Sequence, residues 1–546
     1  MANRSIEQTM QLAFASYQAG KLAEAQRLCA QALAQRPDHP DALHLLAGIA
    51  AQTKQPDRAV ELIRRAIAVN PSVADYHSNL ATILRDLGRT DEAIAAARRA
   101  VQLNPHFAAV HYTLGNSLHD KGLLEESAAA YREAIRLNPG LVLAHNNLGC
   151  VLRELARFDQ AIAAFRNALS LKGDFAEGYN NLGNALRDKG SPDEAIEAYR
   201  QALKLSPNLA VAHNNLGVAF YNKCQPDEAI SAYRQSLRLM PDYAEAHHNL
   251  ATALLLKGDF EQGFAEYEWR WCWRGIAPPR PEYVQPRWNG TALSGKRTVL
   301  HFEGGFGDTI QFARYAPIVA NLGGKVVLEC QAELIRLMRS LGGVEQWVTA
   351  GGPLPPFDEH CRLLSLPLAL GTRLNTIPAN VPYLKPEEEL SRQWSQRLGK
   401  TSGLKVGLAW AGNPSHTKDR NRSLPAASLA PLARVNGVKF YSLQKGESAQ
   451  PSPDFNLIDH TSELNDFADT AAFMMNLDLV IAADTAVAHL AGAIGRPVWV
   501  LIPYAPDWRW LMNRQDSPWY PTMRLFRQKS LGDWAEVIER VASALR

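Results

Sequence analysis

Two stretches of the chain share one pattern: NNLGNALRDKGSPDEAIEAYRQALKLSP at residues 180–207 and NNLGVAFYNKCQPDEAISAYRQSLRLMP at residues 214–241. They begin 34 residues apart, and the same spacing recurs toward the N-terminus. A helix-breaking residue marks each period, at Pro37, Pro71, Pro105, Pro139, Gly173, Pro207 and Pro241. A fixed period of this length is typical of stacked repeats, in which each unit buries its apolar face against its neighbours.

Each period predicts two amphipathic helices. The first carries a leucine nine residues after the proline, as at Leu80 and Leu114, and the second opens on Asp-Glu-Ala-Ile or a similar run. We expect Gly115 to let the two helices approach closely and Gly122 to form the turn between them. Seven units extend from about residue 3 to residue 240, and an eighth grades into an aromatic segment. That segment contains Trp269, Trp271 and Trp273.

These units resemble tetratricopeptide (TPR) repeats, and the resemblance implies a superhelix with a concave groove for a polypeptide acceptor or a partner protein. One position of the first helix carries asparagine in five units: Asn79, Asn147, Asn181, Asn215 and Asn249. Exposed amides can bind the backbone of an extended peptide whatever its sequence. The array of O-GlcNAc transferases has a similar ladder, which Thr113 interrupts here. The alternative is that asparagine recurs because repeats duplicate, and that it caps or spaces helices.

The chain beyond the array predicts a different class of fold. A Pro-rich stretch at residues 276–290 precludes regular helix, and short apolar runs then alternate with helical patterns. Such alternation predicts parallel sheets with helices on both faces. We expect a TPR superhelix at 1–274, a linker at 275–295, and two Rossmann-like lobes at 296–385 and 386–546, joined by a hinge at 381–389. The expected strands are 297–302, 325–330, 406–410, 438–443, 477–482 and 498–502.

Ligands of open parallel sheets bind beyond the carboxyl ends of the strands, so three post-strand segments are candidate sites. In the first, glycines precede Asp308, which is either a catalytic group or a helix cap. In the second, a glycine precedes three basic residues that can surround a diphosphate or form a solvated loop. In the third, a helix beginning near Thr485 can direct N–H groups at phosphate, while His489 binds or packs. The basic residues are Lys418, Arg420 and Arg422.

In this order the three segments resemble glycosyltransferase family 9, whose best-known members are lipopolysaccharide heptosyltransferases. Asp484-Thr-Ala-x-x-His489 is similar to the motif of that family that holds the donor diphosphate, although Ala486 replaces the usual glycine. Gly304 also departs from TPR-linked relatives, which often have glutamine there. The resemblance implies a GT-B fold, a nucleotide-sugar donor, inversion at the anomeric carbon, Asp308 as general base, and no metal or other cofactor. It assigns donor contacts to Lys418, Arg420, Arg422, Gln444, Lys445, Asp484, Thr485, Ala486 and His489.

We therefore expect a glycosyltransferase that modifies Ser or Thr of a protein held by the array. Flagellin is a plausible acceptor by resemblance to TPR-linked flagellin glycosylation proteins. The alternatives are a scaffold with an inactive GT-B domain and a transferase acting on a lipid-linked glycan. A net charge of +3 over 546 residues provides no general attraction for nucleic acid. Scattered cysteines and the lack of a signal peptide or apolar span lead us to expect a cytoplasmic protein without membrane insertion.

Overall fold

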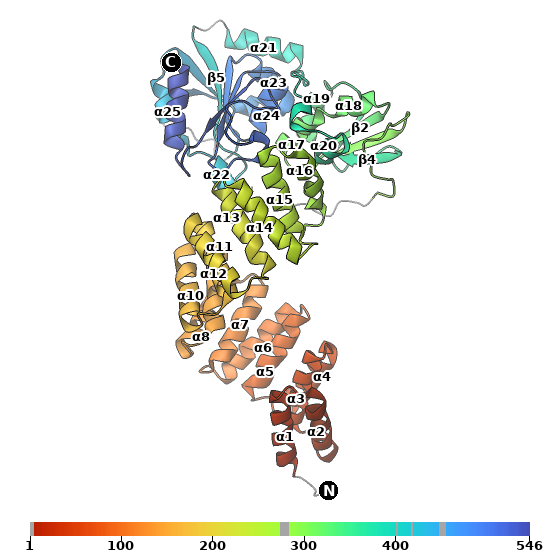
Figure 1. Ribbon diagram of the computed structural model, residues 1–546, viewed down its shortest axis with the longest axis vertical. Helices are drawn as coiled ribbons and strands as arrows, with labels where there is room; N and C mark the ends of the chain where they lie inside the picture. Colours follow the sequence, from red (N-terminus) through yellow and green to blue (C-terminus); the bar gives the residue numbers. More distant parts are fainter. Residues whose placement is uncertain (1–4, 274–282, 400–401, 416–418, 447–454) are drawn as a thin grey trace. The chain divides into compact units, whose positions relative to one another are not determined.

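The computed structural model describes residues 5–273, 283–399, 402–415, 419–446 and 455–546 (Figure 1). The chain divides into two compact units, Met1–Ala219 and Phe220–Arg546. The boundary lies within a single helix, α13 (Ala210–Asn222). Each unit has its own hydrophobic core.

The first unit is a series of antiparallel helical hairpins, as predicted. Its second helices end 34 residues apart, from Gln35 through Leu205, and a helix-breaking residue follows each end by two positions. The helices before α13 are α1 (Ile6–Gln18), α2 (Leu22–Gln35), α3 (Pro40–Gln52), α4 (Pro56–Val69), α5 (Ala74–Asp86), α6 (Thr90–Leu103), α7 (Ala108–Asp120), α8 (Leu124–Leu137), α9 (Val142–Glu154), α10 (Phe158–Leu171), α11 (Ala176–Lys189) and α12 (Pro192–Leu205).

Glycines set the distance between the two helices of several hairpins. A Cβ atom on Gly115 would lie 2.7 Å from the Tyr131 ring, and one on Gly183 would lie 2.5 Å from the Tyr199 ring. Only a residue without a side chain lets these buried rings pack against the facing helix. Gly122 has a φ of 78°, which confirms the predicted turn glycine.

The second unit begins with the last helices of the array. These are α14 (Pro226–Leu239), α15 (Ala244–Lys257), α16 (Phe260–Tyr267) and the 3₁₀ helix η1 (Glu268–Trp271). Here α15 contacts η7 (Trp508–Trp510) and α16 contacts α20 (Leu366–Ala369), so the eighth hairpin packs directly on the α/β region (Figure 1). Within the predicted linker, residues 274–282 lie outside the described part, while Trp288 and Leu293 are buried in the core.

The first sheet has four parallel strands among the described residues, in the order β3-β2-β1-β4. They are β1 (Arg297–His301), β2 (Lys325–Cys330), β3 (Val344–Thr349) and β4 (Glu359–Arg362). The strand order changes direction between β1 and β4, which places the segment after β1 at a topological switch point. The other helices of this lobe are α17 (Phe306–Ala313), α18 (Ala316–Asn321), α19 (Ala332–Met338), η2 (Leu363–Ser365) and η3 (Leu374–Thr376).

The second sheet has six parallel strands among the described residues, in the order β10-β9-β8-β5-β6-β7. They are β5 (Leu404–Ala409), β6 (Val438–Ser442), β7 (Leu457–Ile458), β8 (Leu479–Ala483), β9 (Val498–Ile502) and β10 (Met523–Arg527). Its helices are α21 (Glu388–Leu398), α22 (Asp419–Arg422), η4 (Ala426–Arg434), η6 (Thr461–Glu463), α23 (Phe467–Met474), α24 (Ala486–Ala493), η7 and α25 (Trp534–Leu545). The switch point lies between β5 and β8, where the second and third candidate segments begin.

Two parallel sheets covered by helices confirm the predicted fold class, a TPR superhelix followed by an α/β domain. Among the described residues, no helix combines the length and apolar character needed to cross a bilayer.

Candidate active site

Asp308 lies in the first turn of α17, directly after the glycine-rich segment that follows β1. The Gly305 N–H donates to Asp308 Oδ2 at 2.8 Å, so the carboxylate caps its own helix. Gly304 has a φ of 73°, and a Cβ atom there would lie 2.4 Å from the same oxygen. The cap that the sequence offered as the alternative therefore exists. It uses one oxygen of the carboxylate.

The other oxygen of Asp308 is paired with an arginine from the second lobe. Arg509 Nη2 donates to Asp308 Oδ1 at 2.5 Å, and the two side chains are 10% and 28% exposed. Burial opposes the charge of Arg509, but the carboxylates of Asp507 and Asp308 outweigh it and raise the pKa of the guanidinium. A carboxylate can accept about four hydrogen bonds, so a partly exposed Asp308 can still receive a hydroxyl proton.

The segment after β5 is fixed by side chains around Gly412. A Cβ atom on this glycine would lie 2.4 Å from Asp419 Oδ1, and its N–H donates to Ser423 Oγ at 2.8 Å. Arg422 donates through Nε to Asp419 and through Nη1, at 3.1 Å, to the carbonyl oxygen of Asp484. Arg422 thus joins the second and third predicted segments. Lys418 lies outside the described residues, and so does the side chain of Arg420.

Gln444 and Lys445, the two predicted donor contacts that follow β6, both have hydrogen-bond partners within the protein. Gln444 Oε1 accepts from the N–H groups of Trp410 at 3.0 Å and Ala411 at 2.8 Å, so this buried side chain shapes the loop after β5. Lys445 Nζ donates to the carbonyl oxygen of Leu464. The structure therefore shows both residues organising the loops around the switch point.

Asp484 directly follows β8 and Thr485 is the N-cap of α24, as predicted. Burial and the nearby carboxylate of Asp507 raise the pKa of Asp484 to about 6, although Trp510 and Arg422 act in the opposite direction. Thr485 Oγ1 is buried and has no hydrogen-bond partner among the described residues. It is therefore a donor or acceptor available at the start of a helix whose first N–H groups can bind an anion.

His489 lies within the protein on the same helix. Its Nδ1 is 3.0 Å from the hydroxyl of Tyr520, and its ring stacks on Trp510 at 5.4 Å. Burial lowers the pKa of His489 to about 3, reinforced by the positive charges of Arg509 and Arg314. The imidazole is therefore neutral near pH 7 and offers no positive charge to a phosphate, whereas Arg422 and the helix N-terminus do.

The candidate segments meet where α17 of the first lobe packs on α24 of the second. A Cβ atom on Gly307 would lie 2.9 Å from His489 Cδ2 and 3.5 Å from Ala486 Cα. This contact brings the base candidate beside the predicted phosphate segment. Among the described residues, no group of three His, Cys, Asp or Glu side chains could hold a metal ion.

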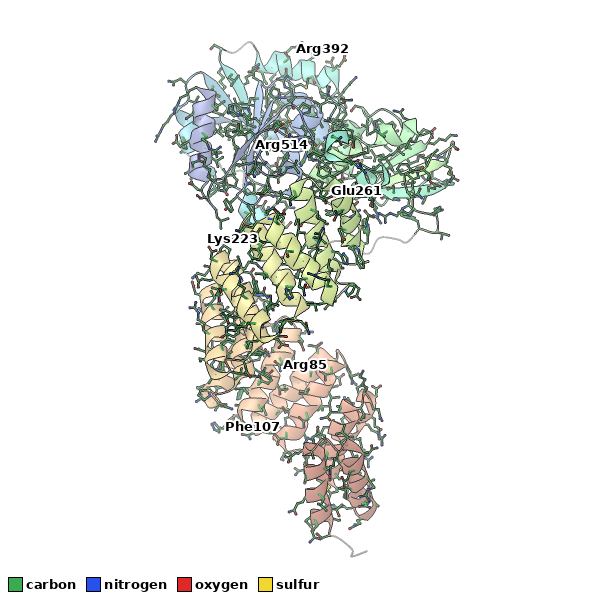
Figure 2. All side chains as sticks on the ribbon, viewed as in Figure 1. Arg85, Phe107, Lys223, Glu261, Arg392 and Arg514 are labelled. Carbon is green, nitrogen blue, oxygen red and sulfur yellow. The ribbon has the colours of Figure 1, made fainter. Side chains whose placement is uncertain are left out.

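Sequence reasoning assigned no role to Arg509 itself, which contacts the predicted base directly. The only signal was its position in Asp507-Trp-Arg-Trp510, shortly after β9. One hollow of about 530 Å³ has Glu261 and Arg514, both labelled in Figure 2, in its lining, which includes none of the predicted site residues. The chemistry of the loops, rather than cavity size, therefore defines the candidate active site.

The asparagine ladder has a structural role that the sequence did not reveal. Four ladder asparagines bond the side chain one position before the ladder in the preceding repeat, as in Asn181 Nδ2 to Asn146 Oδ1 at 3.1 Å and Asn215 Nδ2 to Asn180 Oδ1 at 2.9 Å. Thr113 makes the equivalent contact with Ser78 at 3.1 Å. The further pairs are Asn79 with His44 and Asn147 with Tyr112.

These inter-repeat bonds change the interpretation of the ladder. Asn215 is 8% exposed and donates to Asn180 of the preceding repeat, so the expectation of an exposed amide is wrong there. Thr113 does not interrupt the series, since its hydroxyl replaces the amide. Asn79 is exposed, and Asn147, Asn181 and Asn249 are half-buried. The ladder therefore joins consecutive repeats and leaves only part of its polar surface for a ligand.

Comparison with known proteins supports the array. Models of the tetratricopeptide repeat match residues 16–83, 78–142 and 210–243, and a TPR repeat model matches 149–190 and 183–223. The chain is similar to Protein FlbA of Caulobacter vibrioides, with 30% identity over 325 residues, 54% of this chain and 53% of that protein. It therefore spans about half the length of this curated relative.

Solved structures share the repeats over shorter stretches. The crystal structure of the APC/C hetero-tetramer Cut9-Hcn1 matches with a TM-score of 0.38 and 23% identity, over 43% of this chain and 48% of that one. YrrB, described as a TPR protein with an unusual peptide-binding site, matches with a TM-score of 0.30 and 25% identity, over 35% and 97%. The repeats matched in sequence indicate that this chain binds a peptide or protein partner.

Proposed function

We propose that the α/β domain transfers a sugar from a nucleotide-sugar donor to a Ser or Thr hydroxyl of a polypeptide bound by the array. One observation carries this proposal. Gly307, which precedes Asp308 in α17 of the first lobe, packs on Ala486 and His489 of α24 in the second lobe, and Arg422 donates to Asp484 just before that helix. A carboxylate from one lobe facing an anion-binding segment of the other is the arrangement that a direct displacement requires.

The proposed chemistry assigns a role to each group. Asp308 removes the proton of the acceptor hydroxyl as its oxygen attacks the anomeric carbon. The bond from that carbon to the diphosphate oxygen breaks, and the electron pair leaves with the nucleoside diphosphate. Arg422 and the first N–H groups of α24 stabilise the departing negative charge. Attack opposite the leaving group inverts the configuration at the anomeric carbon.

The repeats supply the acceptor side of the proposal. An array that binds polypeptides, fused to a sugar-transferring domain, would present a protein hydroxyl to Asp308. We propose flagellin as the acceptor to test first. The Oδ1 atom of Asn181 has no hydrogen-bond partner among the described residues, so it can accept a backbone N–H of an extended peptide.

A second candidate function is a TPR scaffold whose α/β domain is inactive. It is favoured by the two structural bonds of Asp308, to Gly305 and to Arg509, which a purely structural carboxylate would also make. The two candidates differ in whether the domain binds and turns over a nucleotide sugar.

The test is a thermal-shift screen of the full chain with UDP-N-acetylglucosamine, GDP-mannose and ADP-glucose, each of which carries its sugar on a diphosphate. A ligand that binds only the folded state at a hundred times its Kd stabilises it by about 2.7 kcal/mol. We expect one donor to raise the unfolding temperature of wild type and of Asp308→Asn, and Arg422→Gln to abolish the shift. Arg434→Gln, which changes an exposed arginine of the same lobe, is the matched control.

Transfer is then measured as the mass added to purified flagellin and as the nucleotide released. Asp308→Asn should bind the donor and lose transfer by about 10²- to 10⁴-fold, the usual contribution of a general base. No shift with any donor would favour the scaffold. A shift and transfer that Asp308→Asn leaves unchanged would remove Asp308 from the mechanism.

A further inference from the structure

Each of the three guanidinium nitrogens of Arg509 donates a hydrogen bond to another side chain. Nε donates to Gln311 Oε1 at 2.7 Å, Nη1 to Asp507 Oδ1 at 2.9 Å and Nη2 to Asp308 Oδ1 at 2.5 Å. Gln311 and Asp308 belong to α17 of the first lobe, whereas Arg509 and Asp507 follow β9 of the second. The planar fork therefore fixes the base candidate of one lobe in relation to the other lobe.

The residue next to Arg509 is enclosed by the last repeat of the array. Trp508 is 2% exposed, and three rings of α16 lie against it. The ring centroids are 6.4 Å away for Phe260, 5.7 Å for Phe264 and 6.4 Å for Tyr267, each in an edge-to-face arrangement. Aromatic pairs of this geometry are directional, so they set the position of Trp508 and of the backbone that carries Arg509.

Backbone carbonyl oxygens of the same segment accept hydrogen bonds from side chains of α13 and of the turn after it. The hydroxyl of Tyr221 donates to the carbonyl oxygen of Pro506 at 3.2 Å, and Cys224 Sγ donates to that of Tyr504 at 2.9 Å. Residues 504–509 thus pass from the end of β9 to Arg509 along helices that belong to TPR hairpins. Part of the wall of the candidate site is consequently built by the array.

We propose that Arg509 is a positioning residue for Asp308, and that the last repeats hold Arg509 in place through Trp508. This inference rests on the proposed function, because it assigns the array a part in the transfer step itself. The array then serves both to bind a polypeptide and to keep the base aligned with the donor segment. A misplacement of about 1 Å at a reacting group can cost about 100-fold in rate.

The experiment measures release of the nucleoside diphosphate from the donor found by thermal shift, with and without purified flagellin. Arg509→Gln should lower kcat by about 100-fold and leave the KM for the donor unchanged, because only transition-state alignment is lost. Arg509→Lys keeps the charge without the fork and should recover part of that loss. Arg514→Gln is the matched control, since Arg514 forms a two-point ion pair with Asp516 in the same segment.

A second substitution tests the contribution of the repeats. Phe264→Leu, in α16, should lower kcat by about tenfold at unchanged donor KM, because it loosens the packing on Trp508. Phe165→Leu makes the same change at a buried ring of a hairpin in the first unit and should leave kcat for donor hydrolysis unaltered. Tryptophan fluorescence for Phe264→Leu, and far-UV circular dichroism for Phe165→Leu, confirm that the variants are folded at the assay temperature.

The outcomes separate this inference from the proposed function. If wild type releases no nucleotide from any donor, the proposed function fails and this inference with it. If wild type is active but Arg509→Gln and Arg509→Lys have wild-type kcat, the positioning role is overturned while the function stands. An effect of Arg509→Gln with none of Phe264→Leu overturns the role of the repeats.

Discussion

Replacing Arg270 by methionine should destabilise the second unit more than any surface substitution. Arg270 is 2% exposed and forms a two-point ion pair with Glu303, from Nε at 2.9 Å and from Nη2 at 2.8 Å. Glu303 is also buried, and it accepts the Leu364 N–H at 3.0 Å. Burial opposes the charge of Arg270, but Glu303 outweighs it and raises the pKa of the guanidinium.

Arg270 also pairs with Glu268, which keeps Arg287 as a second partner, so Arg270→Met leaves one carboxylate, Glu303, without its counter-charge. Breaking a buried pair at one side costs about 3 to 5 kcal/mol, whereas removing both charges costs much less. We therefore expect Arg270→Met to lose about 3 to 5 kcal/mol and the double variant with Glu303→Gln to recover most of it. The glutamine keeps Oε1 for the Leu364 N–H. Arg514→Met, which breaks a more exposed pair, should cost about 0 to 1 kcal/mol.

Tryptophan fluorescence isolates this unit during thermal unfolding, because all 12 tryptophans lie at or beyond Trp269. At about 2 to 4 °C for each kcal/mol in domains of moderate size, the midpoint of Arg270→Met should fall by roughly 6 °C or more. Equal midpoints for Arg270→Met and wild type, or a double variant less stable than Arg270→Met, would refute the argument from an unpaired charge.

Three further predictions concern stability. Gly183→Ala should lower the free energy of unfolding by about 1 to 3 kcal/mol, because its Cβ would lie 2.5 Å from the Tyr199 ring. The loss should appear as a lower midpoint of thermal unfolding by far-UV circular dichroism. Gly88→Ala is the control for backbone strain alone, since Gly88 lies at a turn with open space around it. Between about pH 4 and pH 6 the folded chain keeps a proton on Asp484 that the unfolded chain releases, so this group lowers the free energy of unfolding as pH rises. Asp484→Asn should remove that decline from the urea midpoints measured across this pH range. The same dependence of the midpoint on pH in Asp484→Asn and wild type would contradict the raised pKa. Asn181→Ala should lower the free energy of unfolding by about 1 kcal/mol, because it leaves Asn146 Oδ1 unpaired. The loss should exceed that of Asn79→Ala, which changes an exposed position. Equal losses would show that the inter-repeat bond of Asn181 does not stabilise the array.

The array could be predicted almost residue by residue, since its signal is local and repeated. The strands were predicted according to their place in the sheet. The six expected strands are the interior ones, β1, β2, β5, β6, β8 and β9, whose two faces are both covered. The four that were missed among the described residues, β3, β4, β7 and β10, are all edges. Edge strands carry polar residues, as in Val344-Glu-Gln-Trp-Val-Thr349, and so lack a continuous apolar run.

The candidate site was predicted where chemistry follows a strand directly. Asp308 and Asp484 were found because carboxyl ends of parallel strands gather at one edge, and the structure brings their segments together. Arg509 was missed because its partner Asp308 is 201 residues away and no glycine or basic run surrounds it. The bonds of the asparagine ladder were missed for a related reason, since they join positions 35 residues apart in different repeats.

The loop that carries Asp308 is fixed at both ends by the same hairpin of the array. At its start, Glu303 is paired with Arg270 of η1. At its end, Asp308 is paired with Arg509, whose neighbour Trp508 packs on α16. One hairpin of the array therefore contacts both ends of the loop that carries the proposed base. Separating the array from the α/β domain after Trp271, so that α16 and η1 are both lost, should remove two supports of Asp308 at once.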